Sequence, residues 1–223
     1  MFELTKTKFC NSPLALSMSH AIDKHPDVLR KVSEPGINLA LWTRQPEHAV
    51  KQEVAILSAS HFPDVRRRTS LGSFDDDVCA VLQQQGLNPE NFSSLRADMQ
   101  QLAARLAKVC GSSEFIYRLV TIAGDECCRF HLDRTPLRLI CTYQGPGTEW
   151  LADWQVDREA LARSASNEEI TRFGQPSQFE QFWVGIMKGE SGNRGKGLVH
   201  RSPAVAGSNQ IRVLFCLDSE SQA

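Results

Sequence analysis

A histidine and an aspartate two residues apart, His131 and Asp133, have the side chains and the spacing to do chemistry. They lie in the segment CCRFHLDRTPLRLICTYQGPGTEW, whose first part is expected to form a strand. Side chains two apart on a strand point to the same face, so this imidazole and this carboxylate would reach one point. Both are ligands of mononuclear iron(II) sites, in which a second histidine completes a facial triad. The two residues could instead form a structural hydrogen-bonded pair.

A second histidine and a late arginine extend this pattern. His200 lies in LVHRSPAVAG, directly after a glycine-rich segment that is expected to form a loop. Arg212 opens the apolar segment IRVLFCLD, whose alternation predicts a strand covered on both faces. A buried arginine is costly unless an anion meets it. We therefore expect Arg212 to bind an anionic ligand or to neutralise Asp133 or Glu149.

Two adjacent cysteines, Cys127 and Cys128, precede His131 in the same segment. If residues 127–133 form a strand, Cys127 shares the face of His131. Thiolates are soft ligands that prefer zinc to the iron of an oxygenase. A zinc site built from Cys127, His131 and His200 is therefore an alternative to the iron site, and two packed thiols are the plainer alternative to both.

His-x-Asp, a distal histidine and a later arginine together resemble the 2-oxoglutarate/iron(II)-dependent dioxygenases, whose core is a double-stranded β-helix. The turn Gly-Pro-Gly-Thr-Glu at residues 145–149 resembles the Gly-Gly-x-Thr turn of the prolyl-hydroxylase-like branch. The segment with His200, Pro203, Val205 and Gly207 is similar to the distal-histidine segment of that branch. The whole sequence also resembles an uncharacterised bacterial family of unknown function, through the blocks FHLDRTPLRLICTYQGPGTEW and HRSPAVAG.

The resemblance implies a specific set of catalytic and metal-binding residues. His131, Asp133 and His200 would bind iron(II), and Arg212 would hold the distal carboxylate of 2-oxoglutarate through a bidentate contact. A hydroxyl group commonly assists the arginine, and the candidates for it are Thr142, Tyr143 and Ser202. The chain departs from the family pattern after Arg212, where Val213-Leu214 replaces x-Ser.

The function implied is that of an iron(II)/2-oxoglutarate-dependent oxygenase, of the hydroxylase type, acting on an unknown small-molecule or protein substrate. The alternative is a non-catalytic zinc-binding or zinc-homeostasis protein on the same β scaffold. Arg138 and Glu149, near the expected site, are candidates for a structural ion pair or for substrate contacts.

The elements that must position these residues change in type along the chain. Apolar spacing and turn signals predict helices in the first half and period-two strands from residue 114 onward, with a partly helical excursion at 153–182. The helices are expected at 17–32, from Pro46 to 57, at 73–85 and at 93–110, and the strands at 37–42, 115–122, 127–133, 137–143, 182–187, 198–200 and 211–217; 58–69 is expected to be loop.

This pattern predicts an α+β fold in one integrated domain. Residues 1–113 would form a mainly helical region packed on residues 114–223. By the resemblance, residues 114–223 would form a double-stranded β-helix (jelly-roll, cupin-like) metal-binding core.

Composition narrows the class of protein. The 223 residues have 41% hydrophobic and 23% charged side chains, which are globular values, and a net charge of −1, which offers no footprint for nucleic acid or for an anionic membrane. No apolar run approaches the ~18 residues of a membrane span, and the N-terminus lacks the features of a signal peptide. The seven cysteines include no Cys-x-x-Cys pair, which favours reduced thiols and a cytoplasmic protein.

Overall fold

The computed structural model describes residues 18–193 and 195–220, and Cys10 and most of the N-terminal segment considered above lie outside them. The helices follow where apolar spacing and capping residues favour them. They are α1 (His48–Ala59), α2 (Phe74–Gln84), α3 (Ser93–Cys110), α4 (Arg158–Ala162) and α5 (Asn167–Ile170), with 3-10 turns η1 (Pro26–Ser33), η2 (Pro89–Phe92) and η3 (Asp153–Gln155). No helix of the described residues is long and apolar enough to cross a bilayer.

The strands form a large sheet and a small one. The seven-stranded sheet has the order β1-β2-β8-β5-β10-β4-β3, antiparallel except for the parallel pair β1–β2. The three-stranded antiparallel sheet has the order β7-β6-β9. The strands are β1 (His20–Asp23), β2 (Leu39–Trp42), β3 (Val65–Ser70), β4 (Glu114–Ile122), β5 (Leu137–Gln144), β6 (Glu149–Leu151), β7 (Ser177–Gln178), β8 (Val184–Lys188), β9 (Val199–Arg201) and β10 (Arg212–Ser219).

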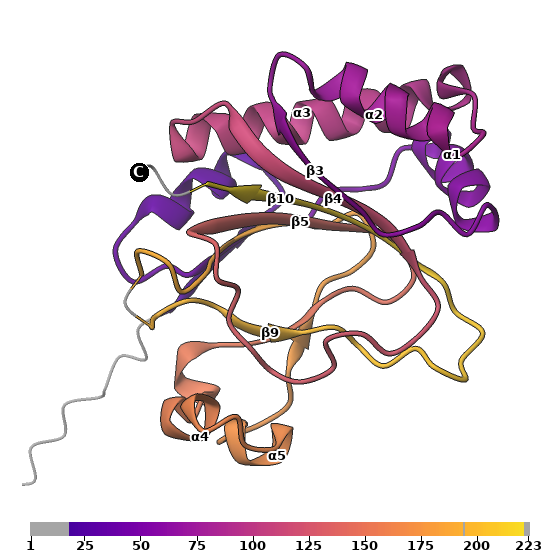
Figure 1. The fold of residues 1–223 in the computed structure, drawn as a ribbon. Coiled ribbons are helices and arrows are strands. Elements are labelled where there is room, and N and C mark those ends of the chain that lie inside the picture. The colour runs from indigo at the N-terminus through magenta and orange to yellow at the C-terminus, as the bar shows by residue number, and fades with distance from the viewer. Residues whose placement is uncertain (1–17, 194, 221–223) are drawn as a thin grey trace, which may run out of the picture.

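The two faces of the large sheet bury different partners. Helices α1, α2 and α3 cover one face, and β9 of the small sheet lies opposite the other, with α4 and α5 beyond it (Figure 1). Alternate residues of β10 divide accordingly: Phe215 packs in the core under the helices, whereas Leu214 packs in the inner core between the sheets. The prediction that β10 is covered on both faces is confirmed.

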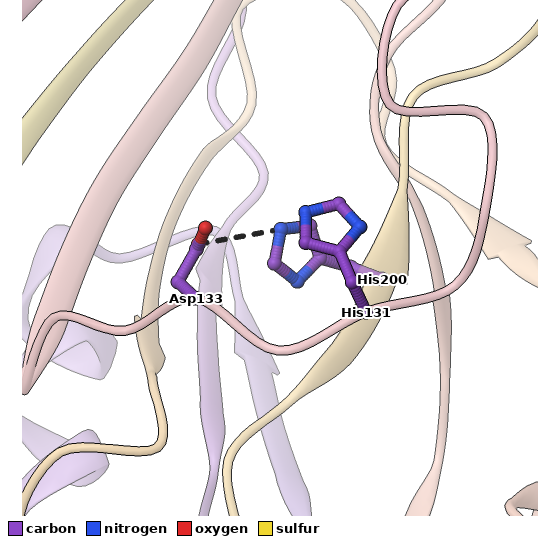
Figure 2. A group of neighbouring side chains, drawn as sticks. All are labelled: His131, Asp133 and His200. Atoms are coloured by element: carbon purple, nitrogen blue, oxygen red, sulfur yellow. Dashed lines mark ion pairs between the residues drawn. The ribbon is translucent and has the colours of Figure 1, made fainter. Parts of the chain in front are cut away.

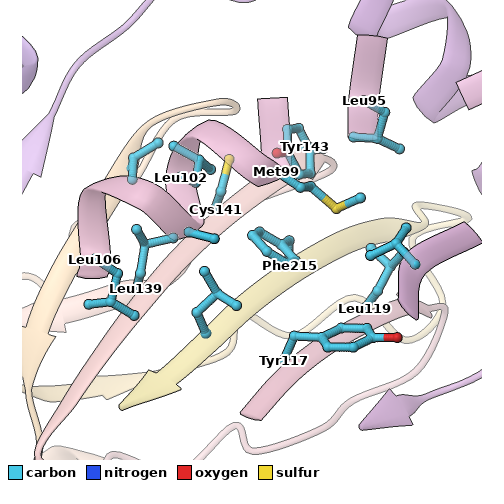
Figure 3. Packing of buried hydrophobic residues seen from close by; sticks show 14 of the residues in the cluster. Leu95, Met99, Leu102, Leu106, Tyr117, Leu119, Leu139, Cys141, Tyr143 and Phe215 are labelled. Carbon is cyan, nitrogen blue, oxygen red and sulfur yellow. The ribbon is translucent and has the colours of Figure 1, made fainter. Parts of the chain in front are cut away.

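In the helix-side core, the apolar stripe of a helix, with a period of 3.6 residues, packs against the apolar face of strands, with a period of two. Leu95, Met99, Leu102 and Leu106 form the buried stripe of α3 and pack over Phe215 and its neighbours in the sheet (Figure 3). Gly111 ends the helix with φ of +69°, a left-handed conformation that favours glycine. This layer supports the large sheet, which carries Arg138 in β5 and Arg212 in β10.

Three sequence expectations need correction. Residues 127–133 do not form a strand, because among them only His131 pairs, in a single bridge. The expected loop 58–69 ends in β3, an edge strand whose three arginines resemble a solvated loop in sequence. The segment expected to be one helix at 17–32 holds β1 and η1 over its described part. Residues 18–113 also supply β1, β2 and β3 to the large sheet.

Candidate metal centre

His131, Asp133 and His200 come together through a loop and a short strand. His131 and Asp133 lie in the loop 123–136 between β4 and β5, and His200 lies in β9. The N–H of His131 donates to the carbonyl of His200 at 3.0 Å, and the N–H of His200 donates to the carbonyl of His131 at 3.1 Å. One ligand atom from each of the three side chains lies within 4.8 Å of the others. The side chains converge on one point (Figure 2).

The Nδ1 atom of each imidazole is hydrogen-bonded to a backbone carbonyl. Nδ1 of His131 lies 2.8 Å from the carbonyl of Arg129, and Nδ1 of His200 lies 3.1 Å from the carbonyl of Leu198. A carbonyl oxygen can only accept, so each Nδ1 carries a proton, and Nε2 is the atom of each ring that is left to face a ligand. Burial, helped by the neighbouring His200, lowers the pKa of His131 and favours its neutral form. This is the tautomer that metal-binding histidines adopt.

The two oxygens of Asp133 have different roles. Oδ1 accepts a hydrogen bond from Nη1 of Arg138 at 2.5 Å, whereas Oδ2 lies 3.3 Å from Nε2 of His200 and is buried with no other partner among the described residues. Burial would raise the pKa of Asp133, but His200 and Arg138 outweigh it and hold the pKa well below its ordinary value. The side chain is therefore an ionised carboxylate with one oxygen left for a ligand.

This arrangement fits a divalent metal ion. A carboxylate oxygen buried beside the Nε2 atoms of two histidines would be costly unless a cation or a proton met it. Two histidines and one carboxylate are the ligands of the facial-triad iron(II) oxygenases, and they also suit zinc. Within the part of the chain that the structure describes, this is the one group of three such side chains.

Arg212 lies on the inner face of the large sheet and lacks an acidic partner. It is 1% exposed and pairs across to Ile122 of the inner core. Its Nε donates to the carbonyl of Pro146 at 2.8 Å and its Nη1 to Oγ of Ser202 at 2.9 Å, while Nη2 is buried and unpartnered among the described residues. Burial lowers the pKa of Arg212, but a guanidinium stays charged at neutral pH.

The acids considered as partners for Arg212 pair elsewhere. Asp133 binds Arg138, and Glu149 binds Arg201 at 2.6 Å, so neither neutralises Arg212. An Arg138–Glu149 ion pair is likewise absent among the described residues, because Arg138 bridges Asp133 and Asp218. Arg212 is thus a buried cation whose Nη2 group has no partner among the described residues.

The three hydroxyl candidates stand in different places. Ser202 touches Arg212 directly, two residues after His200. Thr142 pairs with Leu214 of the inner core, and its Oγ1 is buried without a partner within 18–193 and 195–220. The expectation for Tyr143 is wrong. Its ring lies in the helix-side core and its hydroxyl donates to Asp98 of α3 at 2.6 Å, because successive residues of a strand face opposite ways.

Cys127 does not join the metal group. It is exposed, has φ of +49° and follows the loop rather than a strand, so alternation does not bring it to the face of His131. The zinc site proposed from Cys127, His131 and His200 thereby loses its thiolate. The six cysteines in the described residues are all free thiols.

Arg138, a candidate for an ion pair or for substrate contacts in the sequence, has acidic partners that the sequence did not identify. It lies opposite Asp218 on the neighbouring strand β10. Its Nε and Nη2 donate to Asp218, and its Nη1 donates to Asp133. Its position in an otherwise apolar strand was a signal that an acid must meet it, but the sequence offered several acids at similar separation. Arg138 fixes the carboxylate of Asp133 so that Oδ2 faces the histidines.

Two glycines allow close backbone approach around these residues. A Cβ on Gly189 would overlap the carbonyl of Thr135 and lie 2.7 Å from that of Asp133, and a Cβ on Gly145, whose φ is +80°, would lie 2.7 Å from the carbonyl of Ile211 and 3.0 Å from Cγ of Arg212. Gly145 belongs to the Gly-Pro-Gly turn noted in the sequence. Gly189 thus lets the backbone pack closely against the loop 123–136, here called the metal loop, and Gly145 does the same at Arg212.

Comparison with solved structures gives similarities at low identity. A prolyl-4-hydroxylase of Pseudomonas putida is 11% identical, with a TM-score of 0.46 over 87% of this chain and 98% of that chain. The full-length Neurospora crassa T7H, in complex with alpha-KG and 5-formyluracil, is 10% identical, with a TM-score of 0.43 over 82% of this chain and 74% of that chain. Neither similarity carries a residue role to this protein.

Comparison of sequences identifies the family. No curated protein matches the chain at a significant level. A family model described as "Protein of unknown function (DUF1826)" matches residues 23–218, which include His131, Asp133, His200 and Arg212. The chain therefore belongs to this family of proteins of unknown function.

Proposed function

We propose that this protein is an iron(II)- and 2-oxoglutarate-dependent oxygenase. The observation that carries the proposal is the group His131, Asp133 and His200, in which both Nε2 atoms and one buried carboxylate oxygen face one another and have no other partner among the described residues. The two facing sheets support the interpretation of the fold as a double-stranded β-helix, with His200 of this group in β9 and His131 bridged to it.

Arg212 supports 2-oxoglutarate as the cosubstrate. A buried guanidinium with one unpartnered Nη2 group, hydrogen-bonded to Ser202 and two residues from Leu214, the strand partner of Thr142, suits a carboxylate that accepts several hydrogen bonds. Ser202 is two residues from His200, so this anion site and the metal group stand on one short segment. A dicarboxylic keto acid has one group for the metal and one for the arginine, whereas a metal site alone gives Arg212 no partner.

Each residue would have a defined task. His131, Asp133 and His200 would hold iron(II), which with 2-oxoglutarate supplies the activation of O₂ for substrate oxidation. Arg138 would keep Asp133 ionised and oriented, and Arg212 with Ser202 and Thr142 would hold the distal carboxylate. The inner core around Ile140 and Leu214 would keep water from the bound ligands. The free thiols agree with the reducing, cytoplasmic setting that is part of this proposal.

Anaerobic titration with iron(II) and 2-oxoglutarate tests the proposal. The chelated keto acid should give a weak visible charge-transfer band, which His131→Ala abolishes together with iron binding. Arg212→Met should keep iron binding and weaken 2-oxoglutarate binding. His48→Ala, an exposed histidine of α1, is the control and should change neither.

Two results would overturn it. Absence of the band in folded, iron-titrated protein excludes the cosubstrate. Stoichiometric zinc in the purified protein, lost in Cys127→Ser and indifferent to Arg212→Met, would replace the oxygenase by the zinc-binding alternative.

A further inference from the structure

A cavity of about 760 Å³ opens beside the metal group on the side of His131. Its walls come from the loop at residues 129–134, from α4 and the residues just after it, and from Glu190 and Gly195. Asp133 and His200 are buried behind His131, at 8% and 5% exposure, and do not line the cavity. The volume lies in the range of roughly 300–1,000 Å³ typical of small-molecule sites.

Three arginines line this cavity, and two of them have no acidic partner. Arg129 and Arg134 flank His131 in the loop. Arg129 donates from Nη2 to the carbonyls of Ser164 and Ala165, which leaves its charge uncompensated. Arg134 is exposed and makes no hydrogen bond or ion pair within the described residues. Arg134 can therefore turn to a ligand without losing a contact, and Arg129 keeps its Nε and Nη1 groups for one.

The third arginine, Arg158 of α4, is only partly committed. Its Nη2 binds Asp153 at 2.5 Å and the carbonyl of Gly197 at 3.0 Å, while its Nη1 is buried and has no partner among the residues described. Glu190 is the one acid in the lining, and it is exposed. Three cations against one acid, with Asp153 offsetting Arg158, leave an excess of positive charge at the cavity although the whole chain has a net charge of −1.

An apolar wall completes the cavity. Leu132 and Leu161, both half-buried, and Ala162 line it between the arginines. A ligand that fits this lining has an anionic group for the guanidinium groups and a short apolar body for the leucines.

We propose that this cavity binds the substrate, and that the substrate is a small molecule with a carboxylate or phosphate group on an apolar body. The assignment as substrate rests on the proposed oxygenase function, because the cavity reaches the metal group through His131. The class of ligand rests only on the lining.

The test uses four probes that differ only in their head group: hexanoate, hexyl phosphate, hexanol and hexylammonium. Each is titrated calorimetrically into full-length protein loaded with iron(II) and saturating 2-oxoglutarate, with oxygen excluded, so that binding at Arg212 is blocked. We expect binding of one or both anions and no binding of hexanol or hexylammonium. The stronger of the two anions distinguishes a carboxylate from a phosphate ligand.

Variants locate the binding. Arg129→Gln and Arg134→Gln should each weaken the bound anion roughly tenfold, as expected for loss of a charge-assisted hydrogen bond, while iron titration shows the metal group intact. Arg163→Gln is the matched control: it follows α4, is exposed and does not line the cavity. It should leave anion binding unchanged.

The outcomes separate this inference from the proposed function. If the protein gives the charge-transfer band but shows no preference for the anionic probes, the proposal of an anionic substrate is wrong and the proposed oxygenase function is unaffected. Anion binding that depends on Arg129 and Arg134, in protein that gives no band, overturns the assignment as substrate and leaves only a ligand site. Equal binding of hexanol and hexanoate overturns the proposal outright.

Discussion

Thr142 and Tyr143 are neighbours in β5 with opposite environments. The hydroxyl of Thr142 is buried on the inner face without a partner in the described residues. The hydroxyl of Tyr143 instead binds Asp98, which also accepts hydrogen bonds from Nη1 and Nη2 of Arg44. One residue is therefore available to a ligand and the other is part of a structural polar cluster under the helices.

Substitution of each hydroxyl should separate ligand binding from stability. Thr142→Val should lower 2-oxoglutarate affinity roughly tenfold or more, the value of a hydrogen bond to a charged group, with little change in unfolding free energy. Tyr143→Phe should lower the free energy of unfolding by about 1–3 kcal/mol and leave 2-oxoglutarate affinity unchanged. Calorimetric titration and urea unfolding of both variants measure the two effects. The reverse pattern would mean that the faces are assigned wrongly.

The two tyrosines of the chain, Tyr117 and Tyr143, are both buried, and this predicts alkaline behaviour. Burial raises the pKa of Tyr117 to about 12, and burial with Asp98 raises the pKa of Tyr143 well above its ordinary value. Below pH ~10 both the folded and the unfolded chain hold these protons, so stability is unaffected. Above it the unfolded chain loses them first, and stability falls as pH rises, by ~1.4 kcal/mol per pH unit for each tyrosine.

Tyrosinate absorbance followed together with circular dichroism checks this. We expect the tyrosines to ionise only as the fold is lost, above pH 10, and in urea-unfolded protein at the ordinary value near 10. Ionisation of either tyrosine in native protein near pH 10 would contradict the burial of the rings.

At the scale of elements, the loop 123–136 decides the geometry of the metal group. It has almost no regular structure, yet it is held by the bridge to β9, by Arg138 and by Gly189, whose neighbour Glu190 donates its N–H to the carbonyl of Asp133 at 2.7 Å. Close backbone packing replaces the strand pairing that the sequence suggested.

Gly189→Ala therefore should disturb Asp133. Its Cβ would overlap the carbonyl of Thr135, so the loop must shift, at a cost of about 1–3 kcal/mol in stability. We expect metal affinity to fall about tenfold, a change of the size seen when partners of metal ligands are lost. Gly124→Ala, in the metal loop itself with open space around the new methyl group, is the control and should bind metal normally. Equal affinities in the two variants would show that Gly189 does not position Asp133.

How far the sequence predicted these elements depended on the kind of signal. Helix α3 and strands β4, β5, β8, β9 and β10 carry regular apolar spacing, and the structure has them close to the expected bounds. Edge strand β3 was missed because Arg66, Arg67 and Arg68 give it no apolar alternation, and charged edge strands are common. The loop of Cys127 was taken for a strand because local alternation cannot show whether a partner strand exists.

The site was predictable to the extent that chemistry fixes residue types. His131, Asp133, His200 and Arg212 could be selected because their side chains have few uses inside an apolar core. The partners Arg138 and Ser202 could be fixed only by tertiary structure, because each of them depends on which strands lie side by side. Thr142 and Tyr143 could be told apart only once the register of β5 was known.

At the scale of the whole molecule, the candidate metal ligands link two layers. His131 and Asp133 lie in the loop that connects β4 and β5 of the large sheet, whereas His200 lies in β9 of the small sheet. The first half of the chain closes the same large sheet, with β1 and β2 at one end and β3 at the other. A metal ion at this point would therefore bind the assembled fold and not its separate parts.

This linkage predicts that metal stabilises the entire fold. A ligand that binds only the native state at about 100 times its Kd adds ~2.7 kcal/mol, which for a protein of this size raises Tm by roughly 5–10 °C. Iron(II) or manganese(II), added without oxygen, should give this shift in one cooperative transition, and a chelator should reverse it. Asp133→Ala should remove the shift, since the carboxylate oxygen that faces the histidines is lost. Asp76→Ala, an exposed acid in the first turn of α2, should keep it. A Tm shift that survives Asp133→Ala, or one that is lost in Asp76→Ala, would place the stabilising ion elsewhere. Only an ion bound by His131, Asp133 and His200, at the junction of the two sheets, needs Asp133 in order to oppose global unfolding.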